Sequence, residues 1–229
     1  MVSSGSYSFQ MSNADIIIEA FGRCKIRRAS LLAEHLVDAG KAINLSLVTF
    51  GNRQVNLWSY EQQTISLVAG TSTYTLPART IDILSCFIRI GSGDSQQDRI
   101  LWPVSTFEYS SFSNKNSQGF PSVFWFNRLS TPQIYFYLTP DDTQTYTAYL
   151  QTARQLQDAN LPSGETPDIP YRWIDALCAE TAYRLSRTYA PELEAQRKQD
   201  AAEAWSIAAT EDTENVALNI VPALGGYFQ

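Results

Sequence analysis

The chain shows a helical pattern at both ends and a strand pattern between them. Residues Pro170–Tyr189 repeat apolar and small side chains at helical spacing. The residues on that face are Ile174, Leu177, Cys178, Thr181, Leu185 and Thr188. Pro191 predicts the end of this helix, because a residue before proline avoids the α region. A further helix is expected from Glu192 to about Ala209, so these helices should close a bundle that the chain opens before residue 60.

Two helices are expected in that opening segment. Ser12 followed by Asp15 resembles an N-terminal cap and predicts a short helix over about Asn13–Phe21. A longer helix is expected from about Ser30 to Trp58, with a bend or break at one of its glycines. Its apolar stripe comprises Leu32, Leu36, Ala39, Ile43, Leu47 and Phe50.

The middle of the chain alternates apolar and polar residues between turn signals. The expected strands are 64–68, 73–76, 81–90, 99–102, 123–127, 133–139 and 145–152. Ser105–Phe112 predicts a short helix between strands. The fold class that follows is α+β: an antiparallel helical bundle with an inserted small antiparallel β-sandwich or barrel domain and an extended C-terminal arm. The expected parts are an arm over 1–11, helices over 12–60 plus 168–210, a β domain over 61–167 and a docking arm over 211–229.

Composition narrows the classes of function. The net charge of −6 argues against a protein that coats nucleic acid over its whole surface. Cys24, Cys86 and Cys178 lie far apart and are odd in number, which indicates buried thiols in a reducing compartment. No run approaches the roughly 18 apolar residues that a membrane span needs, so no membrane partner is expected. The first ten residues lack the features of a signal peptide.

Two stretches are candidates for partner contacts. The segment after Glu214 is too apolar for a free tail and should lie on another surface. Its anchors would be Leu218, Ile220, Val221, Leu224, Tyr227 and Phe228. The basic cluster lies between the first two helices and comprises Arg23, Lys25, Arg27 and Arg28. A solvated or partner-facing loop is its default reading, and contact with DNA phosphates or an acidic protein surface is the alternative.

Enzyme signatures are mostly absent, and no catalytic residue, metal site or cofactor is predicted. The chain has no phosphate-binding loop, no dinucleotide fingerprint and no nucleophile elbow. His35 is the only histidine and fits a bundle-flanking or surface position. Asp141 and Asp142 follow Thr139-Pro140 as turn residues, although paired carboxyls of a glycosidase are an alternative reading. An acid such as Glu165 would then be the second candidate for a role in cell-wall hydrolysis.

The aromatic residues of the middle block fall on both faces of the expected sheet. Phe124-Trp125-Phe126 and Tyr135-Phe136-Tyr137 must alternate in direction along their strands. A sugar-stacking platform is one reading of so many rings. Rings on both faces better suit a sheet covered on one side by its own core and on the other by a neighbour.

The order of these elements resembles the head-to-tail adaptor proteins of tailed bacteriophages, also described as head-completion or tail-tubular proteins. The phrases that carry the resemblance are Asn44-Leu45, Asn56-Leu57-Trp58, Gly70–Pro77, Gly119-Phe120-Pro121, Leu138-Thr139-Pro140, Ile169-Pro170 and Trp173–Leu177. Each phrase is short, and the specificity lies in their order and spacing over roughly residues 13–210.

The resemblance implies a structural virion protein that is not an enzyme. It implies a homo-oligomeric ring, most often of twelve copies, at the neck between the portal protein and a tail tube or nozzle protein. Helices would surround the channel through which double-stranded DNA passes without sequence-specific binding, and the C-terminal arm would dock on the portal. Such a protein would be made in the cytoplasm of the host bacterium.

Two other functions are alternatives to that reading. The chain could be a tail-tube or nozzle subunit of the same particle, for which a sixfold stacked arrangement would be usual. It could instead be a carbohydrate-binding or cell-wall-hydrolysing module that uses the aromatic residues and carboxylates of the β domain.

Overall fold

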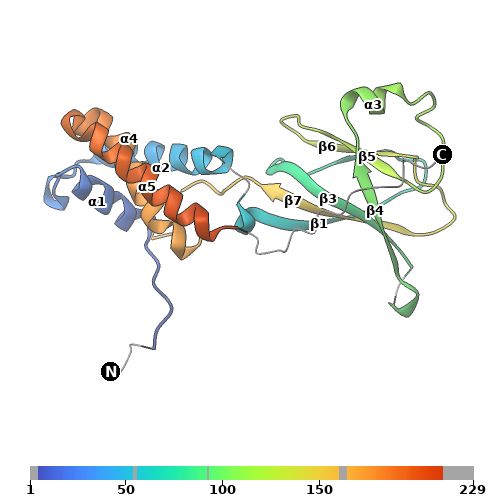
Figure 1. Ribbon diagram of the computed structural model, residues 1–229, viewed down its shortest axis with the longest axis horizontal. Helices are drawn as coiled ribbons and strands as arrows, with labels where there is room; N and C mark the ends of the chain where they lie inside the picture. Colours follow the sequence, from blue (N-terminus) through green and yellow to red (C-terminus); the bar gives the residue numbers. More distant parts are fainter. Residues whose placement is uncertain (1–4, 54–55, 92, 160–163, 214–229) are drawn as a thin grey trace, which may run out of the picture.

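The computed structural model describes residues 5–53, 56–91, 93–159 and 164–213. Helices occupy one end of an elongated molecule, and a curled sheet occupies the other (Figure 1). The helical end consists of α1 (Asn13–Arg23), α2 (Ala33–Arg53), α4 (Ile174–Tyr189) and α5 (Glu194–Glu211). No helix in these described ranges is long and apolar enough to cross a membrane. The expected α+β class is confirmed, while the four-part division of the chain stays a prediction.

Local sequence signals set the starts of the first two helices. Ser12 and Asp15 form a capping box at α1, which confirms the predicted cap. At the start of α2, the backbone N–H of Leu32 donates to Nδ1 of His35 at 2.9 Å. The His35 ring also packs edge-on against Tyr189, so this histidine has a structural role in the bundle.

The second helix is shorter than the sequence predicts. It begins at Ala33 instead of Ser30 and ends at Arg53 instead of Trp58, without a break at either internal glycine. The apolar stripe is also only partly buried, because Leu32 and Leu36 are exposed while its last four residues are buried. Thr188 on α4 is exposed as well, although Leu185 one turn earlier is buried.

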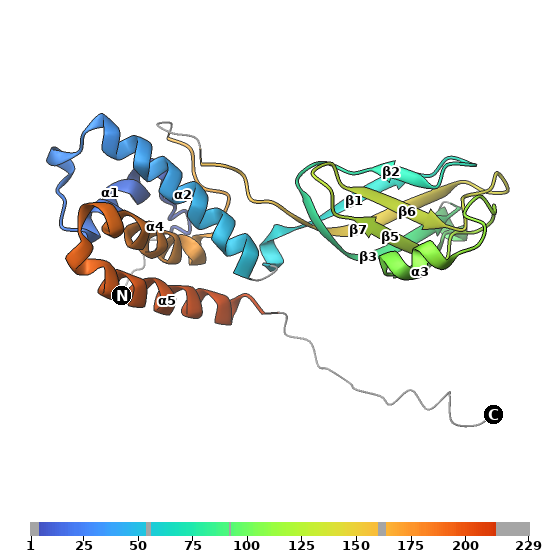
Figure 2. The same ribbon diagram turned by 90° about the horizontal axis from the view of Figure 1, so that it is seen from above.

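Helix α4 is the central element of the helical end. Figure 2 shows α2 and α5 on opposite sides of it. Trp173, in a single 3₁₀ turn before α4, is fully buried, and its ring lies 5.4 Å from Phe50 of α2 and 6.5 Å from Trp205 of α5. The buried carboxylate of Glu180 on α4 binds Arg53 and Arg184 at 3.2 and 3.1 Å. These contacts join three helices around one core.

The sheet has seven strands in the described part of the chain, ordered β1-β7-β3-β4-β5-β6-β2. The strands are β1 (Tyr60–Ser66), β2 (Thr73–Thr75), β3 (Thr80–Ile90), β4 (Gln97–Pro103), β5 (Val123–Asn127), β6 (Gln133–Tyr137) and β7 (Tyr146–Arg154). The seven strands lie near the ranges that the sequence predicts, and the largest shift is at β1, which begins at Tyr60 instead of residue 64. The strands form one curled sheet, a half-barrel, which is consistent with the expected small β domain.

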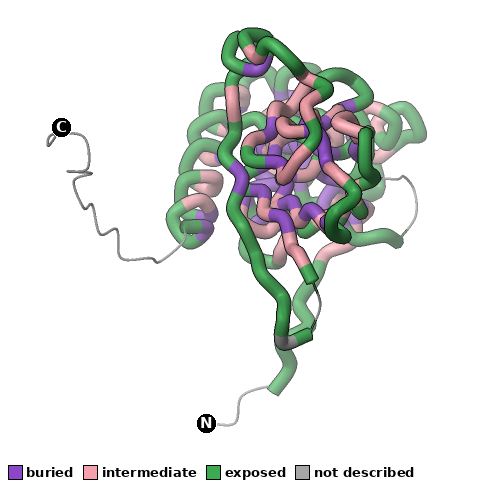
Figure 3. The backbone as a smooth tube through the Cα atoms, turned by 90° about the vertical axis from the view of Figure 1, so that its right-hand side faces the viewer, coloured by how far each residue is buried: buried purple, intermediate pink, exposed green. Residues whose placement is uncertain are grey.

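One strand pair departs from the expected antiparallel pattern. Strands β4 and β5 pair in parallel, with Trp102 opposite Val123. Parallel neighbours need a crossover connection, and here it contains α3 (Thr106–Ser111), which a capping box at Ser105 begins. The concave side of the curled sheet holds its core, including Ile88, Phe124, Ile134, Phe136 and Leu150. Seen from the sheet end, buried stretches gather inside while the outer turns are exposed (Figure 3).

Replacing Phe50 should destabilise the helical end strongly. Phe50→Ala removes a fully buried ring that contacts Trp173, and we expect the free energy of unfolding to fall by about 3–5 kcal/mol. Val37→Ala on the exposed side of the same helix should change it by less than about 0.5 kcal/mol. Denaturant unfolding followed by circular dichroism measures both; equal effects would contradict the proposed core.

Candidate interaction surfaces

The convex side of the sheet carries exposed apolar side chains on β4. Ile100 and Trp102 are each 71% exposed, while Leu101 between them is buried in the core. This alternation follows from the strand period of two, which sends alternate side chains to opposite faces. Large apolar groups exposed side by side on one strand are typical of a contact surface.

Two half-buried rings extend this surface across the neighbouring strands. Phe87 of β3 lies opposite Ile100 in the register and stacks on Tyr149 of β7 with ring centroids 5.0 Å apart. We call Phe87, Ile100, Trp102 and Tyr149 the β4 patch. Because Tyr149 and Trp102 are residue types that dominate binding energy at interfaces, the composition of the patch suits a protein partner.

An ion pair stands at one edge of the β4 patch. The guanidinium of Arg89 lies 4.4 Å from the Tyr149 ring and binds Asp98 at 2.8 Å. This hydrogen bond to Asp98 raises the pKa of Arg89 and lowers that of Asp98. The pair fixes the Arg89 side chain over the aromatic rings, so the patch has a defined polar margin.

The aromatic residues on the convex side of β5 and β6 are covered by the chain itself. Tyr109 of α3 stacks on Trp125 at 5.2 Å, and Phe112 stacks on Tyr137 at 4.1 Å. The expectation that a neighbour covers this face of the sheet is therefore wrong for β5 and β6, because α3 lies there. The uncovered part of the convex side lies at β4. The aromatic triplets of β5 and β6 did not indicate this position.

The basic cluster is split in the structure. Arg23 binds Glu19 at 3.1 Å and Asp175 at 2.6 Å, which ties α1 to α4. Lys25, Arg27 and Arg28 are exposed on the loop between α1 and α2, at the tip of the helical end. Only these three side chains are positioned for a partner or DNA, and that role stays a prediction.

The predicted anchors Leu218, Ile220, Val221, Leu224, Tyr227 and Phe228 lie outside the described residues. The structure does show how the segment before them is held. The buried carboxylate of Asp212, just after α5, accepts hydrogen bonds from the backbone N–H of Leu57 at 3.2 Å and from Arg172 at 2.8 Å. The chain after α5 therefore starts beside the entry to the sheet.

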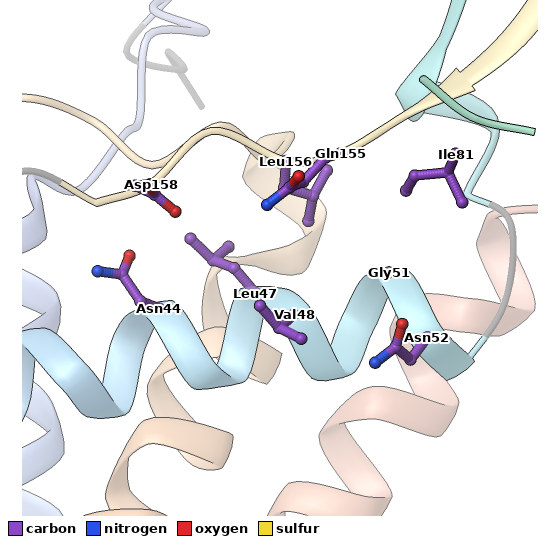
Figure 4. A pocket seen from close by; sticks show the side chains of 9 residues that line it. All are labelled: Asn44, Leu47, Val48, Gly51, Asn52, Ile81, Gln155, Leu156 and Asp158. Carbon is purple, nitrogen blue, oxygen red and sulfur yellow. The ribbon is translucent and has the colours of Figure 1, made fainter. Parts of the chain in front are cut away.

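A groove lies where the helical end meets the sheet. It has a volume of about 220 Å³ and runs between α2 and the segment 155–158 that follows β7. Leu47 and Leu156 form its buried floor, and Val48 and Ile81 are half-exposed on its walls. Figure 4 shows side chains of α2 and of the 155–158 segment pointing toward one another across it. We call this the α2 groove.

The thiols and carboxylates that could react or bind a metal are buried, bonded within a turn, or far from one another. Cys24, Cys86 and Cys178 are free and buried, as predicted, and burial raises the pKa of Cys86 and Cys178 to about 12. Asp141 accepts hydrogen bonds from Thr143 and Tyr146 within the turn before β7, which lowers its pKa. No group of three or more potential metal ligands occurs among the residues that the structure describes.

The two acids considered for cell-wall hydrolysis lie in different parts of the molecule. Asp141 lies in the turn between β6 and β7, whereas Glu165 follows the sheet and accepts the backbone N–H of Asn13 at the start of α1 through its carbonyl. Carboxyl pairs of glycosidases act from about 5 to 9.5 Å apart on one groove, and the fold gives these two no common groove.

Residues 13–220 match the family described as SU10 adaptor protein. The chain belongs to the SU10 adaptor protein family. No curated protein matches it. The match covers α1 to α5 and the whole sheet.

Membership of the SU10 adaptor family makes this chain a structural protein of a bacteriophage particle. An adaptor associates with other head or tail proteins, so its exposed surfaces are candidate functional sites. Sequence reasoning found the aromatic strands but missed the β4 patch and the α2 groove. For the patch, the alternation Ile100-Leu101-Trp102 was the available signal, since three consecutive apolar residues on a strand must point to both faces.

Removing the charge of Asp168 should loosen the junction in a pH-dependent way. Its carboxylate binds Arg154 and accepts the backbone N–H of Gln157 at 3.1 Å. Burial raises the pKa of Asp168, but these bonds outweigh burial and hold it below its ordinary value. The stabilisation is therefore present above about pH 4 and lost as the pH falls through the lowered pKa.

We expect Asp168→Asn to cost about 1–3 kcal/mol at pH 7 and less near pH 3, where the carboxylate begins to protonate. Denaturant unfolding at the two pH values measures this difference. Asp142→Asn, at an exposed turn, is the matched control and should cost less than about 0.5 kcal/mol. A cost for Asp168→Asn that is equal at both pH values would contradict the ion pair.

Proposed function

We propose that this adaptor forms a closed ring that joins the portal of the phage head to the tail and surrounds the DNA channel. The observation that carries the proposal is the exposed β4 patch on a chain of this family. A ring of identical subunits uses a head-to-tail contact, in which one surface of each copy meets a different surface of the next. The elongated subunit, with helices at one end and the sheet at the other, suits such a contact (Figure 2).

The charge distribution supports a channel that DNA crosses without adhering. The chain has a net charge of −6. Helix α5 has four acidic and two basic residues, and Arg197 is paired with Asp200 at 3.1 Å. Since phosphate contacts dominate the affinity of proteins for DNA, an acidic wall keeps that affinity low. We therefore place the helices, with α5 foremost, around the channel.

The C-terminal arm is assigned to the portal in this proposal. Its apolar residues need a covered surface, and Asp212 fixes where the arm leaves the body. The anchors remain the six predicted residues from Leu218 to Phe228. We take twelve as the number of copies in the ring, which is the number that the sequence resemblance implies.

Electron microscopy of phage particles and of the purified protein tests the proposal directly. We expect a ring of this subunit at the neck, under the portal. A particle whose neck lacks the subunit would overturn the adaptor role. A sixfold stack of copies along the tail would favour a tube or nozzle subunit instead.

Changing the β4 patch should weaken ring assembly without unfolding the subunit. In the double variant Ile100→Ser and Trp102→Ala, loss of these exposed groups should cost at least about 2 kcal/mol of contact energy, or about 30-fold in dissociation constant. Light scattering across a concentration series measures assembly. Leu129→Ala, exposed on the turn after β5, is the control and should assemble normally. Unchanged assembly of the double variant would exclude this contact.

Truncation after Thr213 should separate folding from portal docking. The shortened chain keeps Asp212 and its bonds to Leu57 and Arg172, so its melting temperature should stay near that of the full chain. It should no longer join portal rings in a co-sedimentation assay, because the apolar anchors are gone. Portal binding by the truncated chain would show that docking uses another surface.

A further inference from the structure

The N-terminal arm carries aromatic side chains that its own chain does not cover. Tyr7 is 101% exposed and Phe9 is 71% exposed. The base of the arm is anchored to the body, because Met11 packs against the helical core and the backbone N–H of Asn13 donates to the carbonyl of Glu165 at 2.9 Å. Figure 1 shows the arm leaving the helices and pointing away from the body.

Leaving this arm in water is unfavourable. Exposed apolar surface costs roughly 25 cal/mol per Å² relative to burial, and aromatic rings are the largest such groups. The arm has the alternation Tyr7-Ser8-Phe9, so in an extended conformation both rings point to one side and the serine to the other. It also contains no charged side chain between Gly5 and Met11, so burying it desolvates no ion.

The α2 groove has matching dimensions. It extends along α2 from Asn44 to Asn52, which is about 12 Å at 1.5 Å per residue. An extended segment rises about 3.3 Å per residue, so the groove holds about four residues of arm. The rings of Tyr7 and Phe9, two positions apart, would then be about 7 Å from each other, and both would fit within the length of the groove.

The chemistry of the groove also matches an uncharged extended segment. Its floor is apolar, with Leu47 and Leu156 buried. Its rim carries the amide side chains of Asn52 and Gln155, both on exposed residues. Amides both donate and accept hydrogen bonds, as an extended backbone requires. Asp158 is the one acid in the lining, and Figure 4 shows it at the end of the groove, opposite Asn44.

We propose that the N-terminal arm of each copy occupies the α2 groove of the next copy in the ring, with Tyr7 and Phe9 as anchors. This inference rests on the proposed ring. The occupant is a second copy, because in its own subunit the arm leaves the body and the groove stays open. Exchange of arms is a heterologous contact, since the arm and the groove are different surfaces, and it repeats around a closed ring.

Disulfide trapping in the full-length chain tests the exchange. Tyr7→Cys combined with Val48→Cys puts one thiol on the arm and one on the groove wall. Cys24, Cys86 and Cys178 are buried and free, so the introduced thiols are the accessible ones. Tyr7→Cys combined with Ile207→Cys is the matched control, because Ile207 is more exposed than Val48 but lies on α5, outside the groove.

Under oxidation of assembled rings, the first pair should give a ladder of covalently linked subunits on a denaturing gel, at least tenfold more than the control pair. An internal cross-link that leaves a single-subunit band would overturn the exchange, because the arm would then occupy its own groove. A third variant combines Val48→Cys with Leu218→Cys. If it cross-links more efficiently than the Tyr7→Cys/Val48→Cys pair, the exchange is overturned, because the C-terminal segment would then occupy the groove.

Deleting residues 2–10 gives an independent measurement. The deletion should leave the melting temperature within about 2 °C and weaken ring assembly at least tenfold in dissociation constant. If the wild-type chain forms rings but oxidised rings of the Tyr7→Cys/Val48→Cys variant give no ladder, the arm exchange is rejected and the adaptor ring stands. If the wild-type chain forms no ring, alone or on the portal, both the arm exchange and the proposed adaptor ring are rejected.

Discussion

The pairing of β1 with β7 is the constraint on which the rest of the structure depends. The chain leaves the helices through residues 56–60 and returns through 154–158, so both crossings pass one junction. Tyr60 lies opposite Ala153 in the register, which holds the two crossings side by side. Asp168 ties the returning chain to Arg154, and Asp212 ties the end of α5 to Leu57. This ladder and the two carboxylates together hold the helical end against the sheet.

Most of the fold could be predicted from the sequence because its signals are local. A cap at Ser12, proline at position 191 and alternation along the strands each act within a few residues, and each appears in the structure. The parallel pairing of β4 with β5 could not be predicted, because it depends on the path of the connection over residues 104–122, which carries α3. The early end of α2 is likewise set by the junction, where Leu57 must turn to reach β1.

The interaction surfaces were harder to predict for a physical reason. An apolar residue gives the same signal in a sequence whether its own chain or a partner covers it. Leu36 and Ile43 belong to one helical stripe, yet only Ile43 is buried. Trp125 and Trp102 both lie on the convex side of the sheet, yet α3 covers only Trp125. The covered and the exposed member of such a pair can be distinguished only in the folded structure, where segments distant in sequence lie side by side.

The position of the two proposed contacts bears on how a ring could close. The β4 patch belongs to the sheet end, and the N-terminal arm leaves from the helical end (Figure 1). A single heterologous contact leaves the tilt between neighbours free, and a small tilt converts a ring into an open helix. Contacts at both ends of a long subunit fix the rotation and the tilt together. Since the β1–β7 ladder and the junction carboxylates hold the two ends in one orientation, the angle between neighbours becomes a property of the subunit itself.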